Sequence, residues 1–151
     1  MRRSAAHVVS LALLAAPAVA VAQGAPAKQV VTPQGQNANP NLSAGIRVGD
    51  MLYVSGQLGM SRQAPDTTIE GQTRLALENT KRVVEAGGAT MANVVKCTVF
   101  LVNVADFQPM NRVYREFFPS EPPARSTVVV AALVSAGAKV EVECMAALPK
   151  Q

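Results

Sequence analysis

The sequence is poor in the residue types on which many enzymes depend. It has one histidine, His7, two cysteines and no tryptophan among 151 residues. Since His7 lies in a segment with the features of a signal peptide, we expect no histidine in the mature protein. This excludes a Ser-His-Asp triad, a Cys-His pair and any His-ligated zinc or iron site. Catalysis would have to use carboxylates, Arg, Lys, Tyr, hydroxyls, amides, backbone groups and water.

The N-terminus has the composition of an export signal. It begins with a basic stretch containing Arg2 and Arg3, and residues 7–22 are then almost wholly Ala, Val and Leu. The apolar run is interrupted by Pro17, is shorter than a bilayer requires and ends in small residues that a signal peptidase accepts. We therefore expect a signal peptide over residues 1–22 and a periplasmic or secreted protein. A retained membrane anchor is the alternative.

Charge is also scarce, at 16% of the residues, with a net charge of +4. Removing residues 1–22 takes away Arg2 and Arg3 and no acid, so Lys+Arg falls from 14 to 12 against 10 Asp+Glu and the net charge falls to +2. There is no basic stripe and only 4% of the residues are aromatic, so the sequence offers no case for nucleic-acid binding.

The two cysteines, Cys97 and Cys144, are too few to hold a metal cluster alone. Each lies in an apolar run, so we favour two buried thiols in strands. A disulfide is the alternative that an oxidising compartment would permit.

Residues 23–40 are rich in Gln, Pro, Ala, Gly and Asn without an apolar period, which predicts a disordered leader. Residues 41–149 then suffice for one domain. Hydrophobic periodicity and turn residues predict the element order ββαβαββ. The expected strands are 46–48, 51–55, 94–102, 126–133 and 139–147, and the expected helices run from a capping box at Thr67–Glu70 to Gly87–Gly88 and from about 103–106 to Phe118.

This order predicts an α+β fold in which the helices cover one face of the sheet. The other face then meets water or another subunit. Because the strands are so apolar, we favour contact of this face with another subunit over contact with water.

Arg125 is the charged residue least expected in its position, because it starts an apolar strand directly after Pro122-Pro123-Ala124. Its planar guanidinium suits the bidentate recognition of a carboxylate. The alternative is a structural ion pair with Glu141 or Glu143.

Glu141 and Glu143 alternate with apolar residues, so both carboxylates lie on one face of the last strand. They either orient a water molecule or belong to a solvated sheet face. Asn111, beside the apolar stripe of the second helix, either donates to a substrate oxygen or points into solvent.

These residues occur in an order that resembles the Rid (YjgF) family. The segment Arg47–Gln57 is similar to the opening signature of that family. Further landmarks follow in family order over about residues 41–148: Leu77-Glu78-Asn79, Val95–Phe100, Asp106-Phe107 with Asn111 and Tyr114, Pro123-Ala124-Arg125-Ser126, and Val140–Glu143.

The resemblance implies a chorismate-mutase-like α+β fold: a mixed sheet, two helices on one face, and a homotrimer with ligand clefts between subunits. It also implies hydrolysis of reactive 2-imino and enamine acids, such as 2-iminopropanoate and 2-iminobutanoate, to 2-oxo acids and ammonia without a cofactor or metal. Carried over by motif, Arg125 holds the substrate carboxylate and Glu141 orients water or exchanges a proton, with Glu143 as second choice. The cleft would be lined by Ser55, Gly56, Asn111 and the backbone near Thr127.

Two positions depart from the family pattern. Leu42 stands where many members carry an aromatic residue, and Thr127 stands where close relatives often carry cysteine. Two alternatives to an imine hydrolase therefore stay open: a trimer that binds small carboxylates without turnover, and a partner-binding trimer of the same fold.

Overall fold

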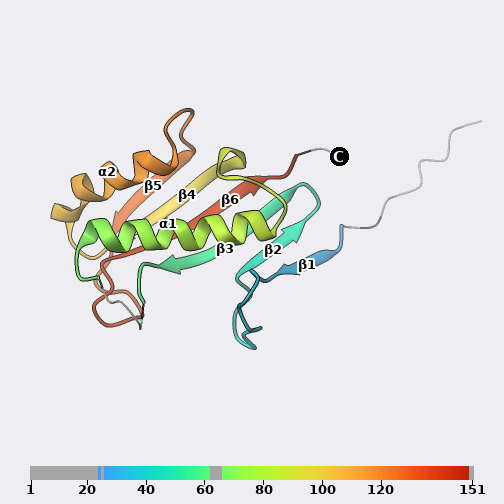
Figure 1. The fold of residues 1–151 in the computed structure, drawn as a ribbon, viewed down its shortest axis with the longest axis horizontal. Coiled ribbons are helices and arrows are strands. Elements are labelled where there is room, and N and C mark those ends of the chain that lie inside the picture. The colour runs from blue at the N-terminus through green and yellow to red at the C-terminus, as the bar shows by residue number, and fades with distance from the viewer. Residues whose placement is uncertain (1–23, 25, 62–65, 150–151) are drawn as a thin grey trace, which may run out of the picture.

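Six strands form one sheet, and two helices lie across the same face of it (Figure 1). The structure is a computed structural model that describes residue 24 and the ranges 26–61 and 66–149. The strands are β1 Lys28–Val31, β2 Gly45–Val48, β3 Met51–Leu58, β4 Val94–Leu101, β5 Ala124–Val129 and β6 Val140–Ala147. The helices are α1 Ile69–Ala86 and α2 Phe107–Phe117, with 3-10 turns at Met91–Asn93 and Val104–Asp106. The predicted α+β class, with both helices on one face, is confirmed.

The strand order is β1-β2-β3-β6-β4-β5, and every neighbouring pair is antiparallel except β4 and β5. The parallel pair follows from α2, which carries the chain back across the sheet between them. The last two strands are consecutive in the chain but are not neighbours in the sheet, because β6 inserts between β3 and β4. This insertion leaves β5 at the edge of the sheet.

Helix α1 follows the predicted apolar period, with its start one residue later than the capping box suggested. Thr68 is the N-cap, and its hydroxyl accepts a hydrogen bond from the Gly71 amide at 3.0 Å. Its inward face is buried: Leu77, Thr80, Val83 and Val84 are each 0% exposed. The helix ends before Gly88, whose φ of +88° lies in the left-handed region that favours glycine.

The segment 23–40 differs from the sequence expectation of a disordered leader. Residues Lys28–Val31 form β1, which pairs along its whole length with β2. The pairing partner lies well over ten residues further along the chain, so the local composition around β1 carried no sign of it. The predicted signal peptide, residues 1–22, lies outside the described residues.

Cys97 of β4 and Cys144 of β6 form a disulfide in the core. The two residues are paired directly across the antiparallel strands and are 0% and 3% exposed. Our preference for two free buried thiols is therefore wrong. The two cysteines face each other only because β6 inserts beside β4.

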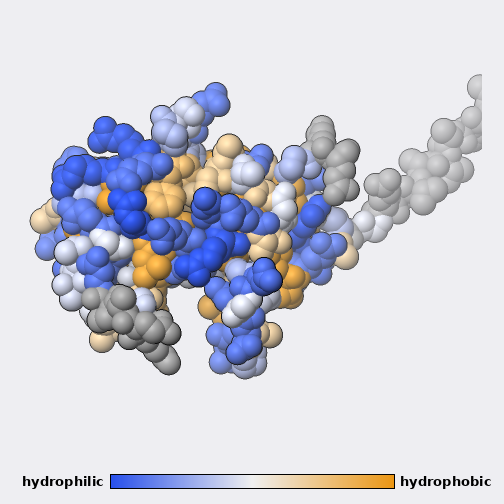
Figure 2. Space-filling model, in the orientation of Figure 1, coloured by the Kyte–Doolittle hydropathy of each residue, from blue (hydrophilic) through white to orange (hydrophobic). Residues whose placement is uncertain are grey.

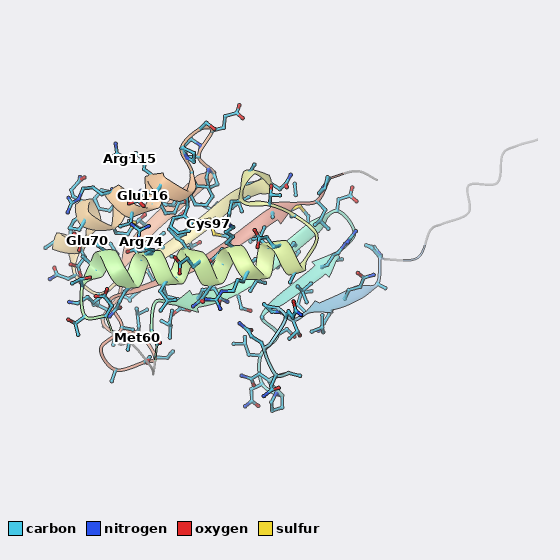
Figure 3. The ribbon with its side chains drawn as sticks, viewed as in Figure 1. Met60, Glu70, Arg74, Cys97, Arg115 and Glu116 are labelled. Carbon is cyan, nitrogen blue, oxygen red and sulfur yellow. A yellow bond between two sulfur atoms is a disulfide. The ribbon has the colours of Figure 1, made fainter. Side chains whose placement is uncertain are left out.

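Two ion pairs connect the outer surfaces of the helices. Arg112 of α2 binds Glu70 of α1 at 3.0 Å, and Arg74 of α1 binds Glu116 of α2 through both carboxylate oxygens, at 2.7 and 2.9 Å (Figure 3). Viewed from this side, hydrophilic residues gather over the helices, with hydrophobic residues visible between them (Figure 2). No helix in the described part of the chain is long and apolar enough to span a membrane.

Candidate functional site

Arg125 is held between β5 and α2 by neutral groups. Its Nη2 donates to Asn111 Oδ1 at 2.7 Å. Its guanidinium carbon lies 4.5 Å from the ring centroid of Tyr114 and 5.9 Å from that of Phe107. These contacts fix the plane of the guanidinium without neutralising its charge.

The register of β5 explains why this side chain meets α2. Arg125 pairs with Cys97 of β4, whose side chain lies in the core beneath the helices. Paired residues project to the same face of a sheet, so Arg125 points towards the helical layer. Asn111 and Tyr114 lie three residues apart on α2 and thus share the face that receives it.

Arg125 takes part in no ion pair within the described residues. The pairs found there are Arg74–Glu116, Lys81–Glu85 and Arg112–Glu70. The predicted alternative, a structural pair of Arg125 with Glu141 or Glu143, does not form in this chain. A cavity of about 440 Å³ opens beside the guanidinium, lined in part by Asn111, Tyr114 and Pro123.

Burial changes the acid–base behaviour of Tyr114, which is 5% exposed. Desolvation raises the pKa of its phenol from 10.0 to about 12, and the nearby charge of Arg125 opposes this increase in part. The phenol is therefore neutral at physiological pH. Its hydroxyl is buried and has no hydrogen-bond partner within the described ranges.

Glu141 lies on the opposite face of the sheet. It alternates with the buried Val140 and Val142 and pairs with Phe100 of β4, so its carboxylate projects away from the helices. Glu143 shares this open face, as the sequence predicted. Neither carboxylate joins one of the ion pairs of the described residues.

A bulge in β3 distinguishes Glu141 from Glu143. The pairing of β3 with β6 shifts between Val54 and Gln57, which is where Ser55 and Gly56 lie. The carboxylate of Glu141 packs over Gly56, and any Cβ at that position would collide with it and lie only 2.8 Å from its Cδ. A larger residue at this position would therefore require the carboxylate of Glu141 to move. The strand, predicted to break at Gly56, instead continues to Leu58.

A second cavity, of about 360 Å³, lies beside the bulge. Gly56 and Gln57 line one side of it, and Leu42 and Ser43 line another. The remaining wall comes from residues 30–39, among them the amides of Gln36, Asn37 and Asn39. This wall was not predicted from the sequence, because the composition of residues 23–40 predicted a disordered leader. The hydroxyl of Ser55 donates to Ser43 O at 2.7 Å and ties the cavity rim to β3.

The predicted site residues thus form two groups that one chain does not bring together. Arg125 and Asn111 lie on the helical side of the edge strand β5, and Thr127 shares their side through its pairing with the buried Val99. Glu141, Gly56 and Ser55 lie on the open side of β3 and β6. The first group can bind an anion. The second holds a carboxylate that joins no ion pair with the described residues and lies beside a cavity.

No set of three or more His, Cys, Asp or Glu residues in the described ranges could hold a metal ion. Tyr114 was predicted from the sequence only as a family landmark, without a role in the site. The signal that could have identified its role is its spacing of three residues from Asn111.

Residues 33–148 match the family model described as "Endoribonuclease L-PSP". The chain is 40% identical over 121 residues to the 2-iminobutanoate/2-iminopropanoate deaminase of Dermatophagoides farinae, covering 78% of this chain and 94% of that protein. It is 39% identical over 112 residues to the chloroplastic Reactive Intermediate Deaminase A of Arabidopsis thaliana, covering 70% of this chain and 58% of that protein.

Solved structures agree with these sequence matches. Escherichia coli TdcF with bound serine superposes with a TM-score of 0.72 at 32% identity, over 80% of this chain and 99% of that one. The Yersinia pestis protein YyfA, of the Rid family, superposes with a TM-score of 0.74 at 35% identity, over 81% of this chain and all of that one.

Proposed function

The chain belongs to the Rid (YjgF, L-PSP) family, and from this we propose that it hydrolyses reactive 2-imino and enamine acids to 2-oxo acids and ammonia. The observation that carries the proposal is the state of Arg125. A half-buried guanidinium oriented by an amide and two aromatic rings, with no acid paired to it in the described chain, is suited to bind a substrate carboxylate.

The reaction requires little beyond positioning. An imine carbon is already electrophilic, and its protonated form is more so. Water adds to this carbon, its departing proton passes to Glu141, and the proton is returned to the nitrogen. When the tetrahedral adduct collapses, its hydroxyl proton passes by way of Glu141 to the nitrogen, the C–N bond breaks, and a C=O bond and ammonia are formed. A carboxylate near water can make both proton transfers, so the scarcity of histidine is compatible with this chemistry.

The two groups of site residues support a site shared between subunits. Arg125 and Glu141 lie on opposite faces of one sheet, so a substrate that meets both must contact two chains. We propose a homotrimer in which the Arg125 side of one subunit meets the Glu141 side of the next. Exposed apolar residues on the open face, such as Tyr53 at 44% and Met145 at 39%, favour its coverage by another copy.

Export belongs to the same proposal. The basic start and apolar run of residues 1–22 support it, and so does a disulfide in the core, because disulfides persist in oxidising compartments. We expect cleavage after Ala22, and mass spectrometry of the mature protein would detect it. A cytoplasmic protein that retains residues 1–22 would contradict export.

The test combines turnover with binding. Imines are generated in situ from 2-aminobutyrate by an amino-acid oxidase, 2-oxo acid formation is followed, and calorimetry measures the affinity for 2-oxobutanoate. Arg125→Ala and Arg125→Lys should both weaken binding, because neither keeps the bidentate fork. Glu141→Gln should retain binding and lose turnover, since the amide cannot accept the proton.

Glu143→Gln is the matched control, because it removes a carboxylate from the same face of the same strand without touching Gly56. Full turnover in Arg125→Ala would refute the carboxylate role. Binding without any turnover in the wild type would instead favour a trimer that binds small carboxylates, for which the serine bound to the related TdcF is a precedent.

A further inference from the structure

A second arginine, Arg115, lines the cavity beside Arg125. Gln108 and Asn111 line the same space of about 440 Å³. Gln108, Asn111 and Arg115 follow one another at intervals of three and four residues, so they form a single polar stripe along α2. The stripe borders the edge strand that carries Arg125. A cavity with two cations and two amides is built for more negative charge than one carboxylate supplies.

Arg115 lies apart from the other charges of its helix. In Figure 3 it is on the side of α2 away from α1, whereas Glu116 lies towards α1 and binds Arg74. Arg112 also faces α1, where it binds Glu70. Within the described chain Arg115 joins no ion pair, and its acidic sequence neighbour Glu116 is already engaged. Its charge is therefore available to the cavity.

Both cations line one cavity, and Asn111 relates their positions. Arg125 is anchored to Asn111 at 2.7 Å, and Arg115 follows Asn111 by four residues, about 6 Å along the helix axis. Because Asn111 Oδ1 accepts from Arg125, its Nδ2 group remains as a donor to a ligand. Pro122 and Pro123 also line the cavity, and their backbone nitrogens cannot donate hydrogen bonds.

We propose that Arg115 is a specificity-determining residue that selects imino acids bearing a second carboxylate on the side chain. This inference rests on the proposed function of the site. Arg125 holds the carboxylate next to the imine, and Arg115 holds the distal carboxylate, as in an imine derived from glutamate or aspartate. The two guanidinium groups thereby select substrates by length and charge.

The experiment compares two imines, one made in situ from glutamate and one from 2-aminobutyrate by the matching amino-acid oxidases, in the full mature protein. We expect the wild type to hydrolyse the glutamate-derived imine with a kcat/KM at least about tenfold higher, the effect of one additional charge-assisted contact. Arg115→Gln should abolish this preference while leaving kcat/KM for the 2-aminobutyrate-derived imine within about twofold.

Arg112→Gln is the control, because it removes the same charge from the same helix one turn earlier, on the face towards α1. An equal loss of preference in Arg112→Gln would reveal only a general field effect and would overturn the proposal. A wild type without preference for the acidic imine would overturn it as well. So would dissociation of the assembly by Arg115→Gln in light scattering, because Arg115 would then belong to an interface.

A binding measurement separates this inference from the proposed function. If neither imine is hydrolysed, imine hydrolysis is refuted, and calorimetry still decides the role of Arg115. The inference then requires 2-oxoglutarate to bind at least about tenfold more tightly than 2-oxobutanoate, with Arg115→Gln equalising the two. Hydrolysis of both imines with equal affinities would leave the proposed function intact and refute the specificity role.

Discussion

The guanidinium of Arg125 lies over the ring of Tyr114, with 4.5 Å between its central carbon and the ring centroid. The ring presents its negative face to the cation, and Asn111 accepts from the edge of the same guanidinium. Tyr114 therefore acts through Arg125 and is a positioning residue. Its hydroxyl adds nothing to this arrangement, since it is buried and has no partner among the described residues.

Substitutions at Tyr114 should separate the ring from the hydroxyl. Tyr114→Phe keeps the ring and removes a buried unpaired hydroxyl, so affinity for 2-oxobutanoate should be retained and stability should be equal or higher. Tyr114→Leu removes the aromatic face, which contributes about 1–2 kcal/mol, and affinity should fall by about tenfold. Calorimetry and thermal melts of both variants check this. Equal affinities in the two variants would refute a role for the ring.

The raised pKa of Tyr114 predicts a loss of stability in alkali. The phenol titrates near 10 when unfolded and near 12 when folded, because burial disfavours the phenolate. The contribution of the neutral phenol is fully present below pH 10 and is lost as the pH rises towards 12. The melting temperature of Tyr114→Phe should therefore decline less than that of the wild type between pH 9 and pH 11.5, a range set by these two pKa values. Parallel declines would contradict the assignment.

Gln72 of α1 connects the helix to the start of β6. Its side chain, 1% exposed, donates from Nε2 to Asp66 O and Gly137 O, each at 3.0 Å, and accepts from the Lys139 amide at 2.8 Å. Lys139 precedes Glu141 by two residues. This glutamine thus fixes the point from which the strand of the candidate proton acceptor begins.

Gln72→Ala should lower stability by about 2–3 kcal/mol, because it leaves buried backbone groups without partners. It should also lower kcat for imine hydrolysis more than it weakens 2-oxobutanoate binding. Gln72 bonds the start of β6, the strand of Glu141, whereas Arg125 lies on β5. Asn79→Ala is the control, as it removes a single hydrogen bond from the same helix, to Leu58 O at 3.2 Å. Comparable losses of kcat in the two variants, measured well below their melting temperatures, would argue against a positioning role.

The sequence predicted those features of the structure that depend on residues close together in the chain. Arg125 stood out because a guanidinium on an apolar strand is anomalous in its own neighbourhood, and α1 was evident from its period. The strand at Lys28–Val31 was missed because its order comes from pairing with β2. The Cys97–Cys144 disulfide was missed for a related reason, as it requires β6 to lie beside β4.

The sequence could not predict that the candidate site residues lie on two faces of the sheet, because this too depends on how distant strands pair. Alternation along a strand shows which residues share a face of that strand. It does not show which face of β5 corresponds to which face of β6, because that depends on the register of both strands with β4. Arg125 and Glu141 could each be named as candidates from the sequence, but their placement on opposite faces required the assembled sheet.

The disulfide should contribute strongly to stability. It closes a loop with a sequence separation of 47 residues, for which the chain-entropy relation gives about 4 kcal/mol, and native disulfides in small domains contribute about 2–5 kcal/mol. Replacing both cysteines by alanine, or unfolding in the presence of a reductant, should lower the melting temperature by about 10 °C or more. The oxidised wild type serves as reference. An unchanged melting temperature on reduction would show that the two thiols are not bonded in the purified protein.

The separation of Arg125 and Glu141 leads to a test by mixed assemblies. If each site combines Arg125 of one subunit with Glu141 of the next, Arg125→Ala and Glu141→Gln are each inactive alone but complementary together. A trimer containing both variants has one intact site in three, whichever variant is in excess. Equal amounts, unfolded together and refolded, should therefore recover about a quarter of the wild-type turnover.

Two controls define the result. Variants refolded separately and mixed only afterwards should stay inactive until subunits exchange, and light scattering should show trimers in every sample. Equal amounts of Glu143→Gln and Arg125→Ala should give about half of the sites, because Glu143 is not required and only the Arg125→Ala subunits lack a functional residue. No recovery in the co-refolded pair, with trimers present, would mean that Arg125 and Glu141 do not serve a common site. A stable monomer with full turnover would remove the shared site altogether, since in one chain the two side chains lie on opposite faces of the sheet.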